Sequence, residues 1–298
     1  MATLSQWVQG ARPRTLPAAL APVAAGTGAA AWQLEALHGD VDWALVIPRA
    51  LLALAVSFSL QIGVNYANDY SDGIRGTDDD RVGPFRLTGS GAARPTTVKR
   101  AAFASLALGG LCGLVLIAVA QLWWMLVIGA AAIAAAWFYT GGKRPYGYLG
   151  LGELFVFVFF GLVAVNGTAY AITGAPGWVA LLASIAIGLL AVALLLPNPP
   201  RHSPPDALSG KRTLAVRLGE RGTRRLYTVT VLAPFALMVP VMVVQWPVVL
   251  VLPALLLALP PVRAVLGGAA GHDLIPVLGA TGRLELVYSL LLLSGLLL

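Results

Sequence analysis

Long apolar stretches separated by short polar connections make up most of the chain. A helix needs about 20 apolar residues to cross a bilayer. Candidate stretches lie at about 15–35, 44–66, 97–117, 121–139, 149–173, 177–197, 226–245, 247–264 and 284–298. The eighth is rich in proline, which kinks membrane helices but is tolerated in them, and the last is short. The pattern predicts an all-α integral membrane bundle of nine transmembrane helices.

Composition supports this prediction. Of the 298 residues, 58% are hydrophobic and only 11% are charged, and the mean hydropathy is +0.80. A soluble domain carries about 25% charged residues, so an ordinary soluble fold is excluded. We expect the first stretch to remain as a span, because no small-residue cleavage site follows a short apolar core. The whole range 1–298 is thus predicted to be one membrane domain.

The basic residues predict the orientation of the spans. Nineteen of the 20 Lys and Arg residues fall in alternate connections, and only Arg49 lies elsewhere. Because cytoplasmic connections are enriched in Lys and Arg, the N-terminus and the two long connections, about 67–100 and 198–225, are predicted to be cytoplasmic. The basic residues occupy separate short loops without interleaved aromatic residues, which argues against nucleic acid as a partner. We therefore expect a multi-pass protein of the cell membrane, and no oligomeric state is predicted.

The first long connection concentrates acidic residues in the stretch NYANDYSDGIRGTDDDRVG, which begins at Asn65. Its five aspartates are Asp69, Asp72, Asp78, Asp79 and Asp80. Asn68 and Asp72 are four residues apart, so they share one face if the helix continues from the second span. Gly76 permits a break, after which Asp78 can fold back toward them. An all-oxygen ligand set of this kind suits Mg²⁺ or Mn²⁺.

Three arginines of the same connection, Arg75, Arg81 and Arg86, can clamp a phosphate through paired hydrogen bonds. The alternative is a solvated acidic loop, which is the ordinary interpretation of a run such as Asp78–Asp80. Carboxylates at the end of a membrane span, however, are costly and usually functional. Acidic, basic and metal-binding side chains at an apolar mouth therefore suggest a site for a diphosphate attached to a lipid.

Motifs spread along nearly the whole chain carry a resemblance to a known family. They are NDYSDGIRGTD, RPRTLPAALAPVAAGTG, RVGPFRLTGSG, YTGGKRPYGYLGLGELFVFVFFGLVAVNGT and GKRTLAVRLG. The first is similar to the first aspartate-rich motif of the UbiA superfamily of membrane prenyltransferases. Together they resemble its 1,4-dihydroxy-2-naphthoate polyprenyltransferase branch.

The resemblance implies a central cavity that opens to the lipid bilayer and the cytoplasm. Two aspartate-rich loops would bind Mg²⁺ and the diphosphate of a polyprenyl diphosphate. The implied enzyme transfers the polyprenyl group to 1,4-dihydroxy-2-naphthoate with loss of CO₂ and diphosphate, and gives demethylmenaquinone for menaquinone biosynthesis. The predicted metal ligands are Asn68, Asp72, Asp78 and Asp206.

The remaining site predictions concern catalysis and substrate binding. The predicted catalytic residues are Asp72, Asp78, Asp206 and Lys211. The predicted substrate-binding residues, for the diphosphate or the acceptor, are Asp69, Arg75, Arg81, Arg86, Lys143, Asn198, Arg201 and Tyr139. For the two lysines, Lys143 and Lys211, an alternative role is to fix the topology alone.

The second long connection departs from the family pattern. The branch has a sequence similar to NNLRDIPTD, whereas this chain has NPPRHSPPD. His202 stands where an aspartate is expected, and prolines between 197 and 205 disrupt the end of the sixth span, at about 3 kcal/mol for each proline inside a helix. Three interpretations stay open: an impaired enzyme, a metal site with altered preference at His202 and Asp206, or a misread DNA sequence over these codons.

Other functions also stay open. A related UbiA-type enzyme could use 4-hydroxybenzoate, haem or a chlorophyll precursor as acceptor, although the GTD spacing and the RVGP stretch argue against it. A transporter, or an inactive scaffold that binds prenyl lipid, belongs to a different class. Carboxylates at the cytoplasmic edge of the bundle, rather than at the bilayer midplane, argue against a transporter.

Overall fold

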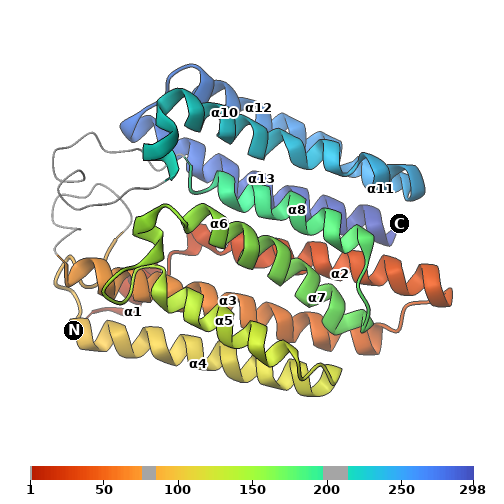
Figure 1. Ribbon diagram of the computed structural model, residues 1–298, viewed down its shortest axis with the longest axis horizontal. Coiled ribbons are helices and arrows are strands. Elements are labelled where there is room, and N and C mark those ends of the chain that lie inside the picture. Colours follow the sequence, from red (N-terminus) through yellow and green to blue (C-terminus); the bar gives the residue numbers. More distant parts are fainter. Residues whose placement is uncertain (1, 76–84, 197–213) are drawn as a thin grey trace.

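The computed structural model describes residues 2–75, 85–196 and 214–298, and within these ranges every regular element is a helix (Figure 1). In chain order the helices are α1 (Leu4–Gly10), η1 (Pro13–Thr15), α2 (Pro17–His38), α3 (Trp43–Gly73), α4 (Pro95–Ala120), α5 (Met125–Phe138), η2 (Tyr146–Leu149), α6 (Gly152–Val156), η3 (Phe157–Val163), α7 (Ala164–Thr173), α8 (Trp178–Ala193), α10 (Leu214–Leu237), α11 (Val239–Val244), η4 (Trp246–Ala254), α12 (Leu255–Leu266), η5 (Gly271–Asp273) and α13 (Leu274–Leu297). The prediction of an all-α fold is confirmed for these residues.

Several of these helices are suited to a bilayer. By length and composition, six helical segments of the described residues can cross a membrane. They are Trp43–Gly73, Pro95–Ala120, Gly152–Thr173, Arg217–Val244, Trp246–Leu266 and Gly271–Leu297. Two shorter apolar helices, Met125–Phe138 and Trp178–Ala193, accompany them. The total of nine spans and the orientation of the N-terminus stay predictions.

One predicted boundary is wrong. The last apolar stretch was expected to begin near 284, but α13 begins at Leu274 and is 24 residues long. Its first turns carry polar residues that break the apolar pattern of the sequence. Thr281 and Glu285 are nevertheless fully buried, because they face neighbouring helices. A hydropathy pattern cannot distinguish a polar residue that faces protein from one that ends a span.

The helices lie roughly along one long axis, which gives the bundle two different ends (Figure 1). We call the end where α3 finishes, at residues 68–73, the aspartate end; α1 packs there through the rings of Trp7 and Tyr66. We call the other end the tryptophan end. Its tryptophans are Trp32, Trp43, Trp123, Trp124, Trp178 and Trp246. Five of the six are 43% to 75% exposed, as in the aromatic belts of membrane interfaces.

Small residues allow the helices to approach closely, as is usual in membrane bundles. One example is the crossing of η3, which is a π-helical segment, with α8. A Cβ atom on Gly161 would lie 2.6 Å from Gly188 Cα, so this crossing requires glycine. A separate small apolar cluster, formed around Tyr66, Leu87 and Val98, lies at the aspartate end. This cluster packs the segment around Leu87 against α3 and α4.

Candidate functional site

The last turns of α3 carry the candidate site. The helix continues beyond the apolar stretch to Gly73, so Asn68 and Asp72 lie one turn apart on the same face, as the sequence predicts. Both side chains are buried, with 9% and 4% exposure. Two buried oxygen-bearing side chains at the end of a membrane helix are costly unless they have polar partners, and those partners come from distant parts of the chain.

Asp72 contacts a different side chain through each carboxylate oxygen. The hydroxyl of Tyr148, in η2, donates a hydrogen bond to Oδ1 over 2.6 Å. The guanidinium of Arg86 lies 3.5 Å from Oδ2 in a buried ion pair. Burial and the Asp72 carboxylate raise the pKa of Tyr148, although Arg75 acts in the opposite direction. The phenol therefore keeps its proton and remains a donor to Asp72.

Asn68 and Arg75 tie the same helix to the connection between α5 and η2. The hydroxyl of Thr140 donates to Asn68 Oδ1 over 2.7 Å. Arg75, just beyond α3, donates to the carbonyl oxygens of Thr140 and Gly142 and lies over the ring of Tyr148, 5.5 Å from its centroid. The connection is thus held against α3 at several points.

Asp69 contacts the main chain of a distant segment. Its two oxygens accept hydrogen bonds from the backbone nitrogens of Leu87 and Thr88, over 2.6 and 2.8 Å, and its predicted contact with substrate stays a prediction. The residue is 1% exposed. Gly73 also belongs to this contact, because a Cβ there would lie 2.4 Å from Thr88 Cγ2. Asp69 therefore links α3 to the segment that carries Arg86.

Of the other predicted residues, some lie within the described ranges and some lie outside them. Tyr139 ends α5, and its ring packs edge-on against Tyr146 at 5.5 Å. Lys143 is exposed in the connection that follows. The predicted residues outside the described ranges are Asp78, Arg81, Asn198, Arg201, Asp206 and Lys211, together with His202.

Sequence reasoning missed Tyr148 and Thr140. Both lie in a stretch that the family resemblance includes, but nothing in the sequence indicates that they contact Asp72 and Asn68. The contacts join residues 76 and 72 positions apart, and only the tertiary packing of α3 against the 139–149 connection brings them together.

The described donor set fits Mg²⁺. Among the described residues, no three His, Cys, Asp or Glu side chains form a metal cluster. The candidate ligand atoms at the aspartate end are therefore the side-chain oxygens of Asn68 and Asp72. Mg²⁺ typically takes one or two carboxylates together with water and substrate phosphates. An amide and a carboxylate beside a buried Arg86 are therefore chemically suited to a cation that arrives with a phosphate ligand.

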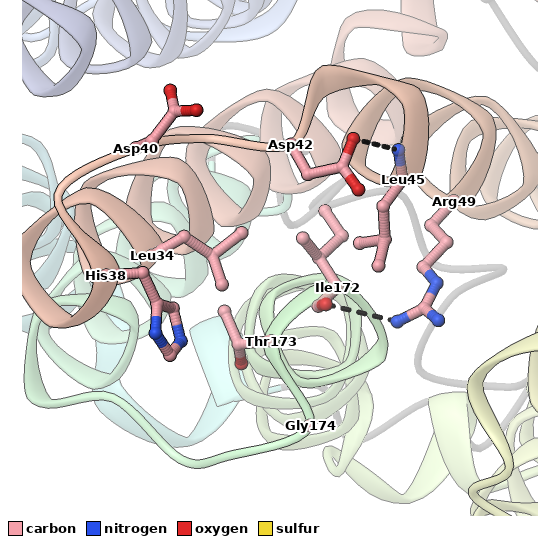
Figure 2. Close-up of a pocket in the computed structure, with 9 residues that line it drawn as sticks. All are labelled: Leu34, His38, Asp40, Asp42, Leu45, Arg49, Ile172, Thr173 and Gly174. Carbon is pink, nitrogen blue, oxygen red and sulfur yellow. Dashed lines mark hydrogen bonds between the residues drawn. The ribbon is translucent and has the colours of Figure 1, made fainter.

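A cavity of about 410 Å³ lies at the tryptophan end, between the α2–α3 connection and the end of α7 (Figure 2). Two of its charged side chains, Asp42 and Arg49, form hydrogen bonds with the main chain. Asp42 accepts hydrogen bonds from the nitrogens of Ala44 and Leu45, and Arg49 donates to the carbonyl oxygen of Ile172. Asp40 points away from the cavity in Figure 2. These contacts cap helix ends and do not assemble a reactive site.

The fold and the aspartate end together define an all-helical membrane protein with a buried oxygen-rich site beside an arginine. The chain belongs to the UbiA prenyltransferase family, whose family model matches residues 19–271, and this confirms the resemblance seen in the sequence. It is 53% identical over 299 residues to 1,4-dihydroxy-2-naphthoate octaprenyltransferase of Mycobacterium tuberculosis, with 99% of this chain and 98% of the relative covered.

Solved structures agree on the fold. The apo structure of a UbiA homolog from Aeropyrum pernix K1 superposes with a TM-score of 0.66 at 16% identity, covering 96% of this chain and 98% of that chain. A UbiA homolog from Archaeoglobus fulgidus bound to DMAPP and Mg²⁺ superposes with a TM-score of 0.58 at 16% identity, covering 97% and 99%.

Proposed function

We propose that this protein transfers a polyprenyl group from polyprenyl diphosphate to 1,4-dihydroxy-2-naphthoate, with release of CO₂ and diphosphate, to give demethylmenaquinone in menaquinone biosynthesis. The observation that carries the proposal is the buried pair Asn68 and Asp72 beside Arg86. The 1,4-dihydroxy-2-naphthoate octaprenyltransferase of Mycobacterium tuberculosis, which matches nearly the full length of both chains, supports the choice of acceptor and donor.

The aspartate end supplies the groups that this reaction needs. Asn68 and Asp72 are the proposed ligands of Mg²⁺, and Asp78 and Asp206 are proposed to complete the set. Mg²⁺, when bound, neutralises the negative charge that develops on the departing diphosphate. Arg86 has a guanidinium that is 8% exposed, and in this weakly screened environment it favours a phosphate oxygen more strongly than it would in water.

We propose that Lys143, which is exposed, and Tyr139, which is half-buried, contact the substrates. Lys143 lies in the connection above the site, where its ammonium can reach the diphosphate or the carboxylate of the acceptor. Tyr139 presents a half-buried ring, and an aromatic face stabilises a nearby allylic cation. Exclusion of water by the surrounding apolar helices protects that cation from hydrolysis.

We further propose that the whole chain is one domain with nine spans in the cell membrane, with its N-terminus and its active site facing the cytoplasm. The basic residues of alternate connections support this orientation. The six long apolar helices and the two shorter ones support a multi-pass protein. The exposed tryptophans at the opposite end are consistent with an interface there.

An impaired enzyme is the second candidate, favoured by one specific observation. The sequence NPPRHSPPD places His202 where the family has an aspartate, and imidazole is a poorer ligand than carboxylate for Mg²⁺. Under this alternative the chain keeps the fold and the aspartate end but turns over slowly or not at all.

Product formation tests both candidates. Membranes that contain the protein receive 1,4-dihydroxy-2-naphthoate or 4-hydroxybenzoate, a polyprenyl diphosphate, and either Mg²⁺ or EDTA, and products are identified by mass. The proposal predicts demethylmenaquinone with Mg²⁺ and none with EDTA. Product that appears only after His202→Asp and repair of the prolines marks an impaired copy. Prenylation of 4-hydroxybenzoate alone contradicts the proposed acceptor.

A further inference from the structure

The connection between α5 and α6, residues 139–151, contacts both candidate metal ligands of α3. Tyr148 donates to Asp72 over 2.6 Å, and Thr140 donates to Asn68 over 2.7 Å. Each contact uses a side-chain hydroxyl and ends on a ligand oxygen. One connection therefore donates two hydrogen bonds to side chains that lie one turn apart on α3.

The connection that provides these hydroxyls is itself fixed. Arg75 donates to two of its carbonyl oxygens and covers the ring of Tyr148. Within the connection, the nitrogen of Gly147 donates to the carbonyl oxygen of Tyr139. The hydroxyls of Tyr148 and Thr140 therefore approach α3 from a defined position.

We propose that Tyr148 and Thr140 are positioning residues that orient Asp72 Oδ1 and Asn68 Oδ1 for the divalent cation, an inference that rests on the proposed function. The Tyr148 hydroxyl donates to Oδ1 of Asp72 and so fixes the direction in which this oxygen points. Arg86 restrains Oδ2, so the carboxylate cannot rotate freely about its χ2 bond.

Hydrogen bonds from the protein to a metal-ligating side chain generally raise the affinity of the site for the metal. Loss of such a partner typically weakens metal binding or activity about 10- to 100-fold. The reason is that an unrestrained ligand must be ordered when the cation binds, and this ordering lowers the affinity. A purely structural role of Tyr148 would instead reduce the stability of the protein and leave the affinity of the folded fraction unchanged.

The chain offers matched controls. Tyr146→Phe removes a hydroxyl two residues from Tyr148, in the same η2 helix, that bonds to a main-chain carbonyl and to neither ligand. Thr140→Ser keeps a hydroxyl at position 140, whereas Thr140→Val removes it at nearly constant volume. These pairs separate the loss of a hydroxyl from the loss of its contact with α3.

The test uses the full-length protein in detergent, with Mn²⁺ alone as the probe and free Mn²⁺ counted by electron paramagnetic resonance. We expect Tyr148→Phe and Thr140→Val to weaken Mn²⁺ binding about 10- to 100-fold, while Tyr146→Phe and Thr140→Ser bind like the wild type. In the product assay, the Mg²⁺ concentration for half-maximal rate should rise for the first pair, with the rate at saturating Mg²⁺ largely retained. Unchanged thermal unfolding without metal confirms that each variant is folded.

The outcomes separate this inference from the proposed function. If the wild type binds Mn²⁺ and makes product, but Tyr148→Phe binds Mn²⁺ equally well, the positioning role is overturned and the function stands. If Tyr148→Phe does not fold, the Thr140→Val and Thr140→Ser pair decides, and equal Mn²⁺ affinity of that pair overturns the inference. If the wild type neither binds Mn²⁺ nor makes EDTA-sensitive product, the proposed function fails and this inference fails with it.

Discussion

The two ends of the bundle use polar side chains in different ways. At the tryptophan end, Arg49 donates to three carbonyl oxygens at the ends of α7 and α4, over 2.9, 3.1 and 3.3 Å, and Asp42 caps the start of α3. At the aspartate end, Asp72 and Asn68 are held by other side chains. Bonds to the main chain complete helices, whereas bonds between side chains orient ligand atoms.

The contrast shows where chemistry can occur in a protein with few charges. A helix end has orphan donors or acceptors that a charged residue satisfies, and such a residue stabilises the helix end. Two charged residues that line the cavity of Figure 2, Asp42 and Arg49, bond to the main chain in this way. The aspartate end is distinguished by what its side chains contact, and the following changes test that distinction.

The largest effect should come from Asp72→Asn. It removes a charge from the proposed metal ligand without changing its size, and we expect the rate of product formation to fall at least about 100-fold. Asp42→Asn at the tryptophan end is the matched control; because asparagine caps a helix about as well as aspartate, stability should change by only about a few tenths of a kcal/mol and the rate per folded molecule should stay the same. Equal rates for the two variants would remove the distinction between the ends.

Asp69→Asn should behave like a change at the tryptophan end, although it lies only three residues from Asp72. The amide has one acceptor oxygen in place of two, so one of the backbone donors of Leu87 and Thr88 loses its partner, at about 1–3 kcal/mol. Thermal unfolding in detergent should show this loss, and Mn²⁺ affinity of the folded protein should not change. A large loss of Mn²⁺ affinity would instead make Asp69 a ligand.

Arg49→Met should lower stability by about 1–2 kcal/mol, because three carbonyl oxygens lose a charged donor. The rate per folded molecule should match the wild type, since Arg49 lies at the opposite end from Asp72. The measurement is unfolding in detergent together with the product assay on the same preparation. Loss of activity beyond the loss of folded protein would mean that the two ends are coupled.

Glu285→Gln should have the smallest effect. The Glu285 side chain is fully buried, and neither of its oxygens has a hydrogen-bond partner within the described part of the chain. Glutamine has nearly the same shape, and the substitution breaks no hydrogen bond of the described residues; because a hydrogen bond contributes about 1 kcal/mol, stability should change by less than that. A loss several times larger in unfolding experiments would show that an ionised Glu285 has a cationic partner.

The sequence predicts those features of the fold and the site that depend on local spacing. Apolar stretches of suitable length locate most of the long helices, and the four-residue spacing places Asn68 and Asp72 on one face. The start of α13 was missed because buried polar residues such as Thr281 interrupt its apolar pattern. The contacts of Tyr148 with Asp72 and of Thr140 with Asn68 were missed because they depend on packing between segments far apart in the chain.

Hydrogen exchange measured by mass spectrometry tests directly whether Mg²⁺ and the diphosphate bind at the aspartate end. The protein is compared without ligand and with Mg²⁺ plus a non-cleavable polyprenyl diphosphate analogue. With the ligands bound, we expect slower exchange at the aspartate end, in peptides over 67–75, 85–93 and 139–149. Exchange at the tryptophan end, over 38–45 and 171–178, should be unchanged. Protection confined to the tryptophan end would contradict the assignment of the site.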